Sequence, residues 1–396
     1  MVEWMKLGEV MKIVRGASPR PITSYLTSDS NGVNWIKIGD VEPGAKYITR
    51  CIEKVTKEGA QKSRYLHSGD FILSNSMSFG RPYILKIDGC IHDGWIAMSD
   101  FETHLSSGYL YEVLNSNRVQ SYWKMKANNG GAMTNLNSDI VKDTIIPIPS
   151  LEEQARIVGI LDTFTSAIDN LKEQIAQRRK QYEYYRDQLL DLEGKPGVEM
   201  KSLSNCCSLI TKQTGFDYSK TIKPSLTTAK LDDSIPFIQN KDFEGTRINL
   251  NTDFYIPFSI AQQFPKIMLN EKILLVSISG KIGNVGLYEL NNVSFVGGAI
   301  CVCRLRKENN GRYILYYLLS HKGQSTLFRS VKAASHSNIT VESIRETLIP
   351  LPSLQEQQRI VSILDTFEAS IQNLEAQLKE REKQYEYYRN KLLTFE

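Results

Sequence analysis

Two glycine-containing segments carry side chains suited to contacts with a base edge or a phosphate. One runs from Ser74 to Arg81 and the other from Ser277 to Asn284; they align at an offset of 203 residues, and both follow an apolar, strand-like run. Hydroxyl, amide and cationic groups hydrogen-bond base edges and phosphates, and a glycine allows close backbone approach. The candidate contacts are Ser74, Ser76, Ser78, Arg81, Ser277, Ser279, Lys281 and Asn284. The alternative is a structural turn in each segment.

A second pair of polar segments lies further along the chain. The first contains Lys124, Lys126 and Asn128, and the second contains Arg329, Lys332 and His336. Cations among small polar residues are typical of phosphate contacts. A solvated loop is the alternative for both segments.

Motifs for chemistry within the chain are missing from the sequence. It contains neither an Asn/Asp-Pro-Pro-Tyr/Phe segment, with which amino-methyltransferases hold a base amine, nor a Gly-x-x-x-x-Gly-Lys-Ser/Thr nucleotide loop. Gly280 and Gly283 are three residues apart, and this spacing favours a tight loop between strands over a phosphate loop. We therefore predict no catalytic residue and no bound cofactor in this chain.

Cysteine and histidine usage argues against a metal site. Six cysteines are too few for a fold of 396 residues that is stabilised mainly by disulfides. The five histidines accompany no Cys-x-x-Cys pair. Cys301 and Cys303 alternate in an apolar run, so we expect them to pack in a core. With no signal peptide and no 18-residue apolar run, the expected location is the cytoplasm, away from membranes.

Charge is distributed unevenly along the chain. The net charge of +4 divides into +2 over residues 1–150, −3 over 151–199, +7 over 200–350 and −2 over 351–396. A polyanion is attracted to the two long basic segments rather than to the two short acidic ones.

The chain is a tandem repeat. Residues 146–190 and 349–393 share 29 of 45 positions at the offset of 203, including Lys-Gln-Tyr-Glu-Tyr-Tyr-Arg in both copies. The chain is nearly twice as long as this offset, so it consists of two tandem copies of one module of about 200 residues.

The repeated segment predicts a long helix. Ser150 and Ser353 are N-cap residues, and Glu153 and Glu356 follow three positions later. Apolar residues then recur with heptad spacing. The first seam is Ile157, Leu161, Phe164, Ile168, Leu171, Ile175, Tyr182, Tyr185, Leu189 and Leu192, and the second is Ile360, Leu364, Phe367, Ile371, Leu374, Leu378, Tyr385, Tyr388, Leu392 and Phe395. Arg178 and Arg381 interrupt the seams at equivalent points, and the tyrosines favour packing or a protein partner over stacking on bases.

These segments predict an α+β tandem repeat. Two similar globular domains, 1–148 and 200–351, contain short strands and helical runs near 110–125 and 311–329. Two long helices, 149–193 and 352–396, follow them, with a linker at 194–199. Because the first helix leads to the second domain, we expect an antiparallel coiled coil with pseudo-two-fold symmetry. The order of the strands does not follow from the sequence.

In its order of domains and helices and in its repeated motif, the chain resembles the specificity subunits of type I restriction-modification systems. The resemblance rests on Pro-x-Pro-Ser-Leu-x-Glu-Gln-x-x-Ile-Val-x-x-Leu followed by Gln-Tyr-x-Tyr-Tyr-Arg in both copies. It implies that the globular domains are target recognition domains, each for one half of an interrupted asymmetric sequence of double-stranded DNA. It also implies that the helices act as a spacer and dock two methyltransferase subunits.

The resemblance further implies two restriction–translocase subunits, so that S-adenosylmethionine, ATP and Mg²⁺ belong to partners and this chain is non-catalytic. Two alternatives stay open. One is a stand-alone methyltransferase or nuclease, which the missing motifs disfavour. The other is a coiled-coil scaffold that binds proteins rather than DNA.

Overall fold

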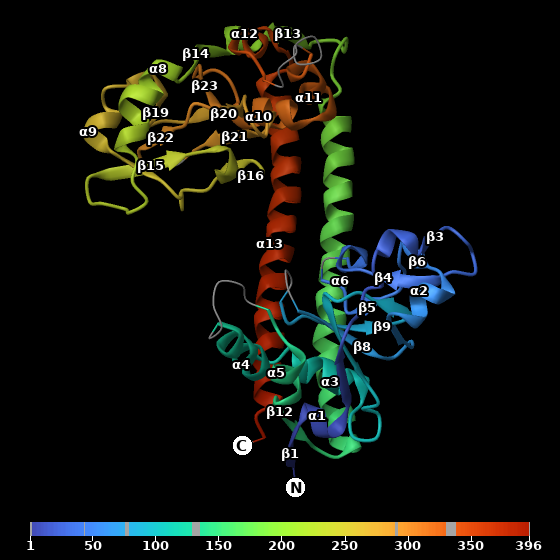
Figure 1. Cartoon of the computed structure of the whole chain (residues 1–396). Coiled ribbons are helices and arrows are strands. Elements are labelled where there is room, and N and C mark those ends of the chain that lie inside the picture. The colour runs from blue at the N-terminus through green and yellow to red at the C-terminus, as the bar shows by residue number, and fades with distance from the viewer. Residues whose placement is uncertain are drawn as a thin grey trace. The chain divides into compact units, whose positions relative to one another are not determined.

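The computed structural model describes residues 2–42, 44–75, 79–128, 135–289, 292–329 and 338–395. It divides into two compact units (Figure 1). The first unit contains residues 1–172 and 376–396, and the second contains residues 173–375. Each unit therefore holds one globular domain together with parts of both long helices.

The first unit contains two five-stranded sheets. One has the order β2 (Lys12–Arg15), β11 (Trp95–Ser99), β8 (Phe71–Ser74), β9 (Pro82–Leu85) and β5 (Tyr47–Ile48). The other has the order β3 (Leu26–Thr27), β6 (Glu53–Val55), β4 (Val33–Ile36), β10 (Gly89–Ile91) and β7 (Arg64–Leu66). A separate antiparallel pair joins β1 (Glu3–Lys6) to β12 (Ile145–Ile148).

Short helices complete this unit and cover its core. They are α1 (Leu7–Val10), α2 (Lys57–Gln61), α3 (Ser107–Leu114), α4 (Asn117–Asn128) and α5 (Ser138–Lys142). Buried Phe71 and Leu73 of β8 belong to the same apolar cluster as Tyr109 of α3, Trp123 of α4 and Ile157 of the first long helix. The globular domain and the start of that helix thus share one core.

The second unit contains two four-stranded sheets. One has the order β14 (Cys207–Lys212), β23 (Ile300–Leu305), β20 (Ile273–Ser277) and β21 (Val285–Tyr288). The other has the order β18 (Tyr255–Pro257), β15 (Ser234–Ile238), β22 (Ser294–Val296) and β19 (Met268–Leu269). Two further pairs join β13 (Glu199–Ser202) to β24 (Leu348–Leu351) and β16 (Phe243–Glu244) to β17 (Arg247–Ile248). The helices are α7 (Leu203–Cys206), α8 (Gly215–Asp217), α9 (Phe258–Ala261), α10 (Gly311–Leu319), α11 (His321–Leu327) and α12 (Val341–Glu346).

Strand order confirms the repeat beyond the segments where the sequence repeats. The order β2-β11-β8-β9 of the first unit matches β14-β23-β20-β21 of the second. In the other sheets, β10 pairs in parallel with β4 and antiparallel with β7, as β22 does with β15 and β19. The α+β tandem architecture is therefore confirmed, and the predicted core positions of Cys301 and Cys303 in β23 are confirmed by their complete burial.

Each helical run that the sequence predicts before a repeated segment is two helices. Ser320 ends α10 and begins α11, because its Oγ accepts a hydrogen bond from the Gly323 N–H at 3.1 Å. In the first unit, α3 and α4 are separated in the same way at Asn115 and Ser116. A serine at the end of an apolar run competes for backbone groups and starts a new helix.

The long helices are α6 (Leu151–Leu190) and α13 (Leu354–Leu392). Ser150 and Ser353 cap them, since each Oγ accepts the N–H of the glutamate three residues later at 3.3 Å. The carboxylates of these glutamates, Glu153 and Glu356, each accept hydrogen bonds from an arginine three residues further on, at 2.6–2.7 Å. The predicted seam positions Leu192 and Phe395 lie beyond the helix ends at Leu190 and Leu392.

Pairing between the two helices is antiparallel. In the second unit, Arg179 lies 2.5 Å from Glu375, and six residues later Tyr185 stacks on Phe367 with ring centroids 5.5 Å apart. In the first unit, Phe164 stacks on Tyr388 in the same manner at 5.2 Å. Across the described residues, no helix has an apolar stretch that could cross a bilayer.

Candidate functional site

The loops that follow β8 and β20 are closed from inside by a serine. The Ser74 Oγ accepts the Arg81 N–H at 3.1 Å, and the Ser277 Oγ accepts the Asn284 N–H at 2.8 Å. Both serine side chains are fully buried. We predicted Ser74 and Ser277 as DNA contacts; in this structure they hold the base of the loop together instead of facing solvent.

A glycine in each loop packs against an aromatic side chain, which lies within α4 in the first unit and directly after α11 in the second. Gly80 and Gly283 have φ angles of 70° and 84°, which favour glycine. A Cβ atom at Gly80 would lie 3.1 Å from the ring of Trp123, and one at Gly283 would lie 2.5 Å from the ring of Phe328. The loop can therefore lie against α4 or the end of α11 only because the glycine has no side chain.

A glutamine fastens each loop to this helix. The Gln120 Nε2 donates to the carbonyls of Gly80 at 2.9 Å and Leu114 at 2.7 Å. The Gln324 Nε2 donates to the carbonyls of Gly283 at 3.0 Å and Leu318 at 2.6 Å. Sequence reasoning missed both glutamines, although their recurrence at an offset of 204 within otherwise divergent segments was a usable signal.

This packing brings the two chain segments that carry the predicted clusters into contact in each unit. Trp123 contacts the loop at Gly80, and Lys124 and Lys126 flank the same turn of α4 with exposed side chains. Exposed Arg329 likewise follows directly on Phe328. The chain then returns to each loop, through Leu136 N–H to Asn75 O at 2.9 Å and Ile339 N–H to Ile278 O at 3.0 Å.

The loops themselves present the remaining predicted residues. Arg81 and Lys281 are exposed, and Ser279 and Asn284 are half-buried. Ser76, Ser78, Lys332 and His336 lie outside the described residues, as does the side chain of Asn128, the last residue of α4. Gly280 and Gly283 form the predicted tight connection between β20 and β21. Each unit thus has exposed cations both on a loop and on the helical segment that packs against it.

A recess opens beside this surface in the second unit. It has a volume of about 540 Å³ and lies between the β20–β21 loop and the β22–β23 connection. Its lining includes Tyr218, Phe237, Asn240, Ser279 and Gly298. The predicted candidate Ser279 therefore belongs to two features, the loop and the recess.

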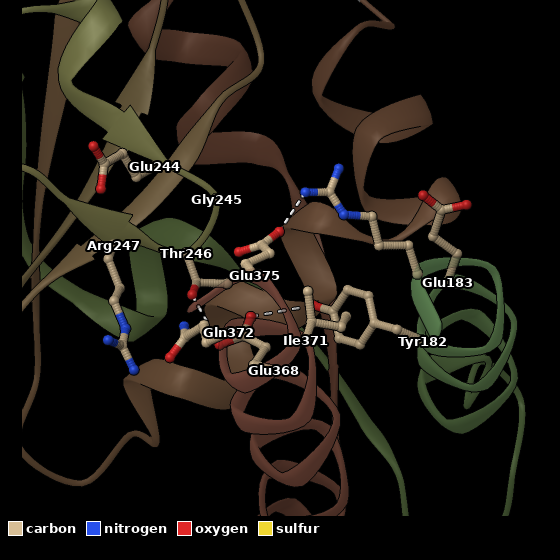
Figure 2. Close-up of a pocket in the computed structure, with 11 residues that line it drawn as sticks. Tyr182, Glu183, Glu244, Gly245, Thr246, Arg247, Glu368, Ile371, Gln372 and Glu375 are labelled. Carbon is tan, nitrogen blue, oxygen red and sulfur yellow. Dashed lines mark hydrogen bonds and ion pairs between the residues drawn. The ribbon is translucent and has the colours of Figure 1, made fainter. Parts of the chain in front are cut away.

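A larger pocket of about 840 Å³ is found where α6 and α13 meet the β16–β17 hairpin in the second unit (Figure 2). Four carboxylates, of Glu183, Glu244, Glu368 and Glu375, outnumber the guanidinium groups of Arg179 and Arg247 in its lining. Glu368 accepts a hydrogen bond from Thr246 Oγ1 at 2.9 Å, and burial raises the pKa of its carboxyl. The excess negative charge makes this pocket unsuitable for phosphates.

The helix tyrosines divide into packed and exposed positions. The Tyr182 hydroxyl is 3.4 Å from Glu368, and the Tyr385 hydroxyl donates to Glu112 at 2.7 Å. Tyr184 and Tyr387, by contrast, are 61% and 60% exposed. Packing is therefore confirmed for Tyr182 and Tyr385, and Tyr184 and Tyr387 stay available for a partner.

Comparison with known proteins assigns this architecture to one family. The family model for the type I restriction modification DNA specificity domain matches residues 1–178 and again residues 197–382. The specificity subunit of the type I restriction enzyme EcoR124I/EcoR124II of Escherichia coli is 32% identical over 264 residues, which cover 63% of this chain and 63% of that protein. A putative type I restriction enzyme specificity subunit of Haemophilus influenzae is 26% identical over 416 residues, which cover 100% of this chain and 96% of that protein.

Solved structures show the same fold. A structure described as the basis of complex assembly and conformational transition of the type I R-M system has a TM-score of 0.65 at 19% identity, covering 99% of this chain and 96% of that chain. The S subunit of a type I restriction-modification system from M. genitalium has a TM-score of 0.52 at 12% identity, covering 100% and 97%.

Proposed function

This chain belongs to the type I restriction-modification DNA specificity family, and from that premise we propose that each globular domain reads one half of a bipartite DNA sequence. The observation that carries the proposal is the repeated loop-and-helix surface. Both units build it on the same strand order, with a serine, a glycine and a glutamine in equivalent roles. The exposed side chains on it differ between the units, as two different half-sites require.

The exposed cations are assigned to the DNA contacts. Arg81 can bridge a guanine bidentately, whereas Lys124 and Lys126 are suited to phosphates. In the second unit, Lys281 and Arg329 are the exposed cations of the equivalent segments, and Asn284 stands at the position of Arg81. Ser279 and Asn284 supply polar groups beside them. The predicted contacts outside the described residues, Ser76, Ser78, Asn128, Lys332 and His336, belong to the same segments. Ser74 and Ser277 shape the loops.

The chemistry is assigned to partner subunits. Two methyltransferase subunits dock on the long helices, with exposed Tyr184 and Tyr387 as contacts. Two restriction–translocase subunits complete a cytoplasmic assembly that cuts unmodified DNA. S-adenosylmethionine, ATP and Mg²⁺ are held by these partners, and this chain acts without a catalytic site of its own.

Methylome sequencing tests the proposal. Co-expression of the chain with its methyltransferase subunit should produce adenine methylation at a single bipartite sequence, and the chain alone should produce none. Exchange of residues 1–148 for another recognition domain should change one half-site and leave the other intact. Methyl transfer by the isolated chain, or a change in both half-sites, would contradict the proposal.

Salt dependence separates DNA recognition from the scaffold alternative. Neutralising phosphates releases counterions, so the affinity for DNA should fall steeply between about 50 and 200 mM salt. Binding that does not change with salt would favour a protein scaffold. Arg81→Ala should in addition weaken discrimination within one half-site, whereas Lys124→Ala should weaken binding to all sequences alike.

A further inference from the structure

The recess of the second unit is bordered by two glycines and a buried aromatic ring. Its rim is the connection from β22 to β23, which begins with Gly297 and Gly298, and its floor includes the buried ring of Phe237. A Cβ atom at Gly297 would lie 3.3 Å from that ring. Two side chains of ordinary size at these positions would cover the recess.

The first unit fills the equivalent place. Its connection between β10 and β11 is also three residues long, but it carries His92 and Asp93 where the second unit has the two glycines. The Asp93 carboxylate accepts the Ser18 hydroxyl at 2.8 Å, and its carbonyl accepts Arg15 Nε at 3.1 Å. Polar groups in this corner of the first unit thus have partners within the protein.

The opposite strand end shows the reverse exchange. After β2 the first unit has Gly16, whose Cβ would lie 2.0 Å from the His92 carbonyl. After β14 the second unit has Gln213, whose amide oxygen lies 3.2 Å from the Cβ position of Gly298. Compared with the first unit, the second unit therefore has Gln213 in place of a glycine at this strand end. In the connection opposite, it has two glycines where the first unit has side chains.

Two amides beside this recess have polar atoms without hydrogen-bond partners among the described residues. Gln213 is 4% exposed, and within the described residues neither its Nε2 nor its Oε1 has a hydrogen-bond partner. Asn240, which lines the recess, donates its Nδ2 to the Ser279 carbonyl, and its buried Oδ1 has no partner among the described residues. A buried amide atom without a hydrogen-bond partner is unfavourable. The Gln213 amide can therefore pair with a ligand that offers a donor and an acceptor side by side, and the Asn240 Oδ1 can accept one further hydrogen bond.

We propose that this recess recognises one adenine of the second half-site, with Gln213 and Asn240 as specificity-determining residues. The adenine edge presents a donor and an acceptor side by side, which is the pattern that a glutamine or asparagine amide complements. Guanine is disfavoured because Lys241, the cation in the lining, already pairs with Asp253. Tyr218 and Phe237 supply aromatic surface for the base. This inference rests on the proposed function and extends it to one base.

Two variants test it in the complete chain, co-expressed with the methyltransferase subunit. Gln213→Leu removes the amide at similar volume, and Gly298→Val places a side chain at the exposed rim. Gln262→Leu, an exposed glutamine at the end of α9, is the matched control. The readout is the methylated motif by genome sequencing, followed by affinities for duplexes with single base changes.

The wild type should require an adenine in the second half-site, on either strand, besides the methylated one. Both variants should lose about 5- to 150-fold of the discrimination at that position and should keep the first half-site. The control Gln262→Leu should keep its discrimination at every position. Gly298→Val still decides the matter if Gln213→Leu does not fold. An unchanged motif in both variants, or the lack of such an adenine, would overturn the inference. If the wild type methylated no bipartite motif at all, the proposed function itself would fail.

Discussion

Two glycines in one loop of the second unit differ in what a methyl group would meet. Both Gly280 and Gly283 have positive φ angles, of 74° and 84°. Among the described residues, a Cβ at Gly280 would have only the Asn240 Nδ2 within 4 Å, at 3.5 Å, whereas one at Gly283 would lie 2.5 Å from the Phe328 ring. Gly283→Ala should therefore lower the free energy of unfolding by about 1–3 kcal/mol more than Gly280→Ala, because only it overpacks the loop. Urea unfolding of both variants measures this difference; equal losses would show that the loop does not rest on Phe328.

Glu112 links stability to pH. Its side chain is buried on α3, accepts the Tyr385 hydroxyl at 2.7 Å, and has a pKa raised above 4.5 by desolvation. The folded chain therefore binds this proton more tightly than the unfolded chain does, so stability is lost as the pH rises from 4.5 through the raised pKa.

Glu112→Gln removes this dependence, since the amide oxygen still accepts from Tyr385. The variant and the wild type should have similar Tm values at pH 4.5, and the variant should be the more stable at pH 8. Each 1 kcal/mol corresponds to about 2–4 °C in Tm for a unit of this size. Exposed Glu386→Gln is the control and should leave the profile unchanged. A difference in Tm that is constant with pH would mean that Glu112 stays ionised.

At the scale of elements, α10 is joined to α13 by Arg312 in the second unit. Its guanidinium lies 2.7 Å from Asp365 and 3.4 Å from Glu368, and it is 21% exposed. Arg312→Met leaves both carboxylates without this cation and should lower the free energy of unfolding by about 2–3 kcal/mol, somewhat less than for a fully buried pair. Adding Asp365→Asn and Glu368→Gln should restore most of the loss. If the triple variant is no more stable than Arg312→Met, the loss comes from packing rather than from charge.

The long helices follow from the sequence because their information is local. Heptad spacing and the caps at Ser150 and Ser353 predict both helices, and only the last turns differ. The sheet order is not predictable in this way, since strands of two to six residues pair with partners distant in sequence. The loop serines illustrate the same limit for the site. Their residue types fit DNA contacts, but whether Ser74 points outward or inward is decided by the hydrogen bond that closes the loop.

At the scale of the whole chain, duplication has preserved the framework and changed the contents. The strand order is common to both units, but the buried glutamate that meets a helix tyrosine comes from α3 in the first unit and from α13 in the second. The corner occupied by His92 and Asp93 in one unit is a recess in the other. Each domain therefore depends on its own junction with the helices, which agrees with independent reading of two half-sites.

We expect the two long helices to set the distance between the two half-sites. We propose inserting one heptad after Ile175 in α6 and one after Leu378 in α13. Seven residues keep each apolar seam on the same face and lengthen each helix by about 10 Å. That length corresponds to roughly 3 base pairs of about 3.4 Å and to a rotation of roughly 100° around the duplex. The variant should either methylate the same half-sites at a longer separation or lose methylation because the domains no longer face the groove.

A four-residue insertion in α6 alone is the control for register: it shifts the seam to another face and should impair assembly. Methylome sequencing of both strains reads the separation directly. An unchanged separation at full activity in the double-insertion strain would show that the helices do not set the distance between the half-sites.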